Sequence, residues 1–266
     1  MTIGEALKEE RENLGLSRYK FSKGVVDRKF YGKVEENNGV LSSEKLIQLL
    51  QKNNIDFAQF FEKVKSNENL DAEKLDRAMR EAFEKRDINE CKQVCQSIMK
   101  LKGERILKLR TIVAIAYLDK NLDALEENIR KEIVEEIYKS NNITQNVSII
   151  RLFANTMPIL SNEQLNVLVS EFLRKAKKSK PKSEIEGRRI AVLLNNYLAA
   201  CWERKINSNL VDDSMEYLMQ MKDVHLLVYK EVGKFYFELI KGNGNEAKKI
   251  KHNLADWGYQ KLANTL

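Results

Sequence analysis

The sequence predicts an all-α protein of two domains. Helix breakers are rare, because the 266 residues include only two prolines and eleven glycines. Hydrophobic residues make up 43% of the chain and charged residues 32%, and they recur in amphipathic segments joined by short polar turns. No strand-rich region is present. The length is enough for one small and one larger domain, each with its own core.

Five helices are expected in the first 65 residues. The first covers about residues 2–13, with Ile3, Leu7 and Leu14 on its apolar stripe. Two short helices follow at 17–23 and 27–36, opened by the capping residues Ser17 and Asp27. Ser42 and Asp56 can cap the remaining two helices. The apolar residues expected to close this core are Leu46, Leu49, Leu50, Phe57, Phe60 and Phe61.

Residues 14–38 have the pattern of a helix-turn-helix, with a Gly-Val-Val turn between the two short helices. Tyr31 and Val34 lie three residues apart and face the core in this prediction. The outer side of the second helix is basic, which suits a phosphate-lined groove. An ordinary solvated helix pair remains the alternative. The candidate DNA-binding residues are Arg18, Lys20, Arg28, Lys29, Phe30, Gly32 and Lys33.

Residues 3–64 resemble the five-helix DNA-binding domain of lambda-repressor-like regulators, through GEALKEERENLGLS, the helix-turn-helix and the Leu-rich helix after it. The resemblance implies a DNA-binding domain over 1–65 and a double-stranded DNA operator as partner. Two positions depart from the usual pattern. Asp27 stands where Ser is common, and Gly32 where a small polar residue is expected.

The polar stretch KSNENLD places a linker at 66–72. Residues 73–266 then form about five helical hairpins. Apolar helix segments begin at Arg110, Arg151, Ala191 and Glu231, a spacing of about 40 residues. This recurrence predicts an α-solenoid with tetratricopeptide-like hairpins. An ordinary helical bundle is the alternative.

The full chain also resembles the Rgg/GadR/MutR regulators of Gram-positive bacteria, through IIRLFANTMPILSNEQL, IAVLLNNYLAACWE and EAKKIKHNLADWGYQKLANTL. This resemblance implies a cytoplasmic transcription regulator for quorum sensing. It would form a homodimer through the repeat domain and bind a short signalling peptide on its concave surface. Some members link protomers through a cysteine near the DNA-binding domain, but this chain has no cysteine before Cys91.

Asparagines interrupt the apolar helices that would line the concave surface. Asn155 and Asn195 lie 40 residues apart and Asn196 follows. A carboxamide matches one peptide unit and can hold an extended backbone. Buried amides satisfied within the fold are the alternative reading. Arg110 or Arg151 could meet a ligand carboxylate, and the aromatic candidates for apolar pockets are Phe153, Tyr197, Trp202, Tyr229, Phe235 and Tyr236.

Other functional classes have little support in the sequence. No catalytic constellation is visible, so we expect no enzyme, metal or cofactor. Cys91 and Cys95, one helical turn apart, indicate buried apolar side chains, with a metal site or redox pair as the alternative. The N-terminus lacks a signal-peptide core. No segment reaches the length of a membrane helix. The net charge of +7 favours a polyanionic partner. A helical-repeat adaptor that does not bind specific DNA remains the second hypothesis.

Overall fold

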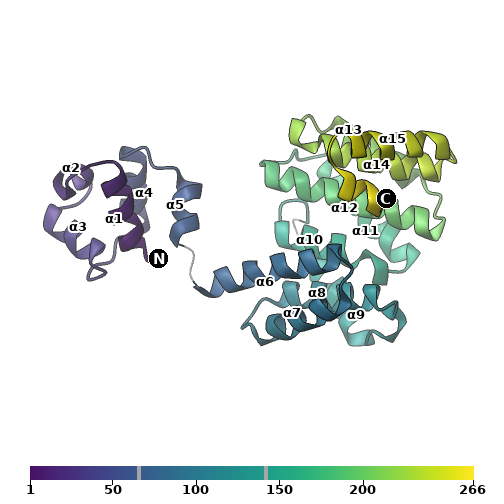
Figure 1. Cartoon of the computed structure of the whole chain (residues 1–266), viewed down its shortest axis with the longest axis horizontal. Helices are drawn as coiled ribbons and strands as arrows, with labels where there is room; N and C mark the ends of the chain where they lie inside the picture. The colour runs from purple at the N-terminus through teal and green to yellow at the C-terminus, as the bar shows by residue number, and fades with distance from the viewer. Residues whose placement is uncertain (65–66, 141–142) are drawn as a thin grey trace. The chain divides into compact units, whose positions relative to one another are not determined.

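The computed structural model describes residues 1–64, 67–140 and 143–266. For residues 67–70 it describes the backbone but not the side chains. Every regular element in these ranges is a helix, which confirms the all-α class. Contacts within the chain divide it into two units, Met1–Arg77 and Ala78–Leu266. Figure 1 labels the helices of both units.

The first unit contains five helices and the start of a sixth. Their bounds are α1 Ile3–Asn13, α2 Arg18–Ser22, α3 Arg28–Glu35, α4 Ser43–Lys52, α5 Phe57–Val64 and α6 Asn67–Glu84. The predicted caps are confirmed. Ser17, Asp27 and Ser42 each accept a backbone N–H of the helix that follows, and Asp56 accepts the N–H of Gln59 at 2.8 Å. These caps satisfy backbone donors that a helix start leaves unpaired.

The residues that α1 buries in the core differ in part from its predicted apolar stripe. Leu7 is buried as expected, whereas Ile3 and Leu14 are 39% and 45% exposed. Gly4 takes the inner position instead, because a Cβ there would lie 2.0 Å from the Val34 carbonyl oxygen. The apolar face of α1 is therefore set by close helix contact, which a hydrophobic spacing does not reveal. In α5, only Phe60 is buried among the three phenylalanines, and Leu46, Leu49 and Leu50 are buried as predicted.

The second unit is built from the end of α6 and ten further α-helices among the described residues. Their bounds are α7 Ile88–Lys100, α8 Arg105–Leu118, α9 Glu127–Lys139, α10 Val147–Thr156, α11 Asn162–Ala176, α12 Glu184–Arg204, α13 Asn209–Gln220, α14 Leu227–Ile240, α15 Gly244–Asp256 and α16 Gln260–Thr265. Short 3₁₀ turns interrupt the chain at Leu122–Ala124, Met157–Ile159 and Val224–Leu226.

Every second helix of this unit belongs to one inner row. α8 packs on α10, α10 on α12, and α12 on α14. Each of these helices contains one of the predicted apolar segments, and their first residues recur at about the expected 40-residue spacing. The α-solenoid prediction is thus confirmed, with a continuous core running from Leu109 to Leu226. In Figure 1 the last hairpins, α13 to α15, lie side by side at one end of this unit.

The predicted linker at 66–72 lies mostly inside a helix. α6 begins at Asn67, so residues 67–72 are helical, and residues 65–66 lie outside the described residues. The domain limits 1–65 and 73–266 remain a proposal. Cys91 and Cys201 are buried and Cys95 is half-buried, and all three are free thiols. Among the described residues, no helix combines the length and apolar character that crossing a bilayer requires.

Candidate functional site

The outer face of α3 carries basic side chains on a firmly capped helix. The Asp27 carboxylate accepts the backbone N–H of Lys29 at 2.8 Å and that of Phe30 at 3.3 Å. These backbone hydrogen bonds lower the pKa of Asp27, so the cap stays ionised at neutral pH. Arg28, Lys29 and Lys33 are exposed, and Phe30 is 38% exposed. The face can therefore meet a polyanion without rearrangement.

A buried carboxylate at the end of α3 ties this helix to the rest of the unit. The Glu35 side chain has no exposed surface and pairs with Arg11 Nε at 2.5 Å and Arg18 Nε at 2.7 Å. Burial alone would raise the pKa of Glu35, but the hydrogen bonds from the two arginines outweigh it and the pKa falls. The sequence analysis did not identify this network, since the signal is a Glu and two Arg that are distant along the chain.

Two of the candidate DNA-binding residues serve this network. Arg18 Nη1 also pairs with Glu36 at 3.1 Å, so its guanidinium is held by two carboxylates. Gly32 is buried rather than on the outer face, and a Cβ there would lie 3.1 Å from Arg18 Nη1. As a candidate DNA-binding residue, Gly32 was expected on the outer side of α3, and this expectation is wrong: the buried glycine leaves room for Arg18. Arg18 and Gly32 position α3.

The preceding helix, α2, is fixed through its last carbonyl groups. The Lys52 ammonium donates to the carbonyl oxygens of Lys20 and Phe21, both at 2.9 Å. Asn53 Nδ2 adds a bond to the Phe21 carbonyl at 3.2 Å. A cation near a helix C-terminus is favourable because the terminal carbonyls carry partial negative charge. The side chain of Lys20 stays exposed, on a helix that packs against α3.

In the second unit, several residues predicted to line the concave surface lie on the inner row of helices. Arg110 Nε of α8 donates to Asn155 Oδ1 of α10 at 2.7 Å. Asn196 Nδ2 of α12 donates to the Ala154 carbonyl at 2.8 Å. Asn155 is exposed, while Arg110, Arg151, Asn196 and Tyr229 are half-buried. These five residues come from four neighbouring inner helices and retain accessible surface.

Three other residues predicted for the concave surface pack inside the core of the second unit. Asn195 is 6% exposed, and its Nδ2 donates to the Tyr229 carbonyl at 2.9 Å. Tyr197 has no exposed surface and donates its hydroxyl proton to Asn166 Oδ1 at 3.2 Å. Phe235 is 5% exposed and belongs to the core beneath α15. In this conformation, these side chains join helices and present no open surface to a ligand.

The remaining aromatic candidates divide between core and surface. Phe153 has no exposed surface, Tyr236 is half-buried, and Trp202 is 44% exposed. A pocket of about 650 Å³ lies among α9, the Met157–Ile159 turn, the start of α11 and the end of α12. Its two arginines, Arg130 and Arg204, already donate to backbone carbonyls around the Met157–Ile159 turn. Their guanidiniums therefore stabilise that turn. No cluster of three metal-ligating side chains occurs within the described ranges.

Comparison with known proteins gives matches among solved structures only. No family model and no curated protein sequence matches the chain. A protein assigned as a transcriptional regulator of Listeria monocytogenes EGD-e superposes with a TM-score of 0.76 at 16% identity, over 99% of this chain and 94% of that one. The SHP pheromone receptor Rgg2 of Streptococcus dysgalactiae gives a TM-score of 0.71 at 13% identity, over 99% of this chain and 96% of that one.

A third similar structure is PrgX in its complex with cCF10, with a TM-score of 0.68 at 14% identity, covering 100% of this chain and 97% of that one. All three alignments include both the N-terminal unit and the helical repeats, because each covers nearly the whole chain. The resemblance to Rgg-type regulators expected from the sequence is therefore confirmed in three dimensions, and the chain has the fold of these regulators and pheromone receptors over its whole length.

Proposed function

We propose that the protein is a DNA-binding transcription regulator whose repeat domain senses a short signalling peptide. The observation that carries the DNA-binding part is the exposed basic face of α3, capped by Asp27 and anchored through Glu35. A rigid helix with cations on its free side suits the major groove of DNA, where phosphate contacts fix the register and base contacts select the sequence. The full-length structural similarity to regulators supports the same assignment.

A shift assay with the DNA upstream of the chain's own gene tests this proposal. The full chain should bind that DNA more tightly than a shuffled sequence, and Arg28→Ala should reduce the difference. Lys8→Ala is the matched control, since Lys8 is exposed on α1 of the same unit but lies on a different helix. If both variants bind like the parent chain and no sequence preference exists, the adaptor hypothesis replaces the regulator.

The peptide-sensing part rests on the inner row of the solenoid. Arg110, Arg151, Asn155, Asn196 and Tyr229 are exposed or half-buried and provide guanidinium, carboxamide and aromatic groups on four neighbouring helices. Such a set can pair with peptide backbone and a carboxylate while apolar side chains are buried. Among the similar structures, PrgX is described in a complex with cCF10, and one structure is a peptide pheromone with its receptor.

A homodimer through the repeat domain completes the proposal. One helix-turn-helix covers few base pairs, and a two-fold pair presents two of them to half-sites about one helical turn apart or a multiple of it. Sedimentation of the full chain at micromolar concentration should show a dimer. A monomer with full affinity for a single half-site would contradict this arrangement. The proposed site of action is the cytoplasm, where DNA and a re-imported peptide meet.

A further inference from the structure

The exposed face of α3 carries one apolar side chain among its cations. The exposed residues of this helix are Arg28, Lys29, Phe30 and Lys33, and the Phe30 side chain is 38% exposed. Lys33 follows Phe30 by three residues and is therefore its neighbour on the helix surface. A single exposed apolar side chain is ordinary on a protein surface. This one is distinctive because cations surround it on the face proposed to meet DNA.

Contacts on the inner side of α3 fix its rotation about its own axis and keep Phe30 outside. The Tyr31 ring lies 5.2 Å from the Phe21 ring of α2, and the Tyr31 hydroxyl donates to the Leu7 carbonyl of α1 at 3.4 Å. Glu35, on the same inner side, is bound by two arginines. Turning Phe30 toward the core would break all of these contacts. The ring therefore belongs to the surface of the free protein.

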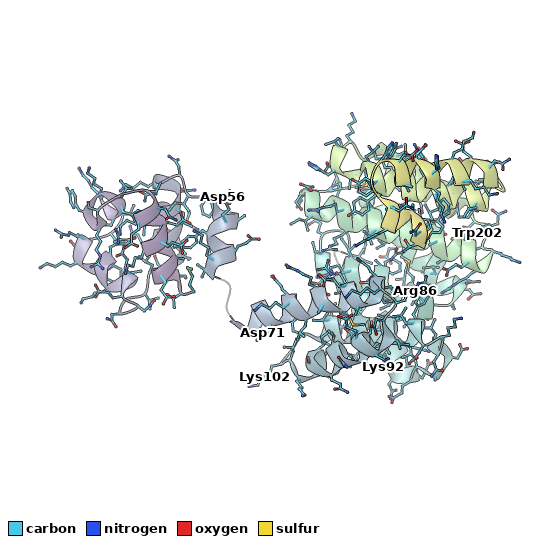
Figure 2. All side chains as sticks on the ribbon, viewed as in Figure 1. Asp56, Asp71, Arg86, Lys92, Lys102 and Trp202 are labelled. Carbon is cyan, nitrogen blue, oxygen red and sulfur yellow. The ribbon has the colours of Figure 1, made fainter. Side chains whose placement is uncertain are left out.

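The position of Phe30 along the helix is fixed as well. Its backbone N–H donates to the Asp27 carboxylate at 3.3 Å, and the N–H of Lys29 donates to the same carboxylate at 2.8 Å. α3 packs on α1 and α2 and lies across the first unit from α5, which begins just after Asp56 (Figure 2). The Phe30 ring is thus presented on a backbone that is held at its start and along its inner side.

Within the described part of the chain, Phe30 has no aromatic or cationic partner. The ring pairs and the cation–ring contacts found there involve other residues. Tyr19 of α2 provides the contrast, because it is 52% exposed but has the Lys23 ammonium 5.7 Å from its ring centroid. Two neighbouring helices therefore present one exposed aromatic ring with a partner and one without.

The charge of this face selects the class of partner. Three exposed cations surround the Phe30 ring, and the Asp27 carboxylate at the helix start is occupied by two backbone N–H groups. Such a surface attracts a polyanion such as DNA. The major groove of DNA presents hydrogen-bonding groups on every base pair, and its apolar group is the C5-methyl of thymine. An apolar ring among cations matches that methyl group and the phosphates around it.

We propose that Phe30 contacts the methyl group of a thymine in the operator and so makes the protein select thymine at that position. This inference rests on the proposed DNA-binding function. The cations of α3 can contact phosphates or base edges, whereas the Phe30 ring gains only from apolar surface. Burying one methyl group corresponds to about a fourfold difference in affinity for one half-site. For a dimer on two half-sites the difference is about fifteenfold.

Replacing thymine by uracil in the DNA tests this contact, because uracil lacks only the C5-methyl group. The probe is the fragment upstream of the chain's own gene, amplified with either dTTP or dUTP, and affinity of the full chain is measured by a shift assay. The thymine fragment should bind about fourfold to fifteenfold more tightly than the uracil fragment. The salt slopes should be equal, because both fragments have the same phosphates. Single thymine-to-uracil replacements should then locate the loss at one position of each half-site.

Variants assign the preference to one side chain. Phe30→Ala should bind the thymine and uracil fragments equally, and Phe30→Leu, which keeps an apolar side chain, should retain part of the preference. Tyr19→Ala is the matched control, because it removes an exposed aromatic ring from the neighbouring helix and should leave the full preference. The comparison of the two fragments on the parent chain needs no variant, so it decides even where a substitution disturbs folding.

The outcomes separate this inference from the proposed function. Sequence-specific binding with equal affinity for the two fragments overturns the thymine contact while DNA binding stands. A thymine preference that persists unchanged in Phe30→Ala overturns the role of Phe30 and assigns the preference to another residue or to DNA shape. Absence of sequence-specific binding to either fragment, with the chain folded, overturns the DNA-binding function and the thymine contact with it.

Discussion

Replacing the buried carboxylate of the first unit, Glu35→Gln, should destabilise that unit strongly. The carboxylate has no exposed surface and accepts from Arg11 at 2.5 and 3.2 Å and from Arg18 at 2.7 Å. Removing one partner of a buried ion pair costs about 3 to 5 kcal/mol. Two features reduce this figure here. The Arg18 side chain is 37% exposed, so solvent screens its charge, and Gln keeps one acceptor. We expect a loss of about 2 to 4 kcal/mol.

Native-state hydrogen exchange of the full chain measures this loss within the first unit. Amides of α4 around Leu49 and Leu50 are buried in the same core and report its opening. A loss of about 2 to 4 kcal/mol corresponds to exchange that is about thirtyfold to several hundredfold faster. Glu36→Gln is the control, because Glu36 is 55% exposed and pairs with the same Arg18. Equal protection in the two variants would refute the reasoning.

The same network gives a pH dependence with a definite sign. The pKa of Glu35 is lower in the folded protein than in the unfolded chain, because its bonds to Arg11 and Arg18 outweigh the effect of burial. Its contribution to stability is therefore complete above about pH 4.3, the usual pKa of Glu, and is lost as the pH falls through the lower folded value. The difference between the parent chain and Glu35→Gln should shrink over that acidic window.

Three further outcomes follow from the contacts of particular side chains. Gly4→Ala should destabilise the first unit by about 1 to 3 kcal/mol in chemical denaturation, since its Cβ would overlap the Val34 carbonyl; an unchanged midpoint would contradict the close approach of α1 and α3. Arg28→Ala and Lys29→Ala should each weaken operator binding, by about 1 to 3 kcal/mol for a base contact, and a phosphate contact should lower the salt slope by about one. Asn195→Ala should lower the melting temperature because the buried Asn195 side chain bonds α12 to the Tyr229 carbonyl of α14, whereas Asn155→Ala should leave melting nearly unchanged and weaken peptide binding by about 0.5 to 1.5 kcal/mol; the opposite pattern would show that Asn155 is the structural residue.

Most of the secondary structure followed from local signals. Ser17, Asp27 and Ser42 could be placed as caps because an N-cap depends on a short polar side chain next to the helix it opens. The apolar spacing likewise located the inner helices of the solenoid. The inward position of Gly4 could not be found in this way, since it depends on how closely α1 approaches α3.

The functional surfaces were less accessible to sequence reasoning. The exposure of Arg28, Lys29 and Lys33 was predicted, because their position on α3 follows from the burial of Tyr31 and Val34. The supporting roles of Arg18 and Gly32 were not, since both depend on Glu35, which is 17 residues from Arg18.

The two asparagines of α12 show how a correct period can still select the wrong side chain. A spacing of 40 residues pairs Asn155 with Asn195, yet Asn195 bonds inward to Tyr229 while Asn196 bonds to the Ala154 carbonyl beside Asn155. Neighbouring residues on a helix point about 100° apart. An error of one residue in the assumed period therefore selects a core residue such as Asn195 in place of the more accessible Asn196. Repeats of unequal length produce this error, since the loops between inner helices add or remove residues without changing the packing. The contact that aligns two inner helices, here the bond from Asn196 to α10, is therefore the better guide to which residues face the proposed peptide.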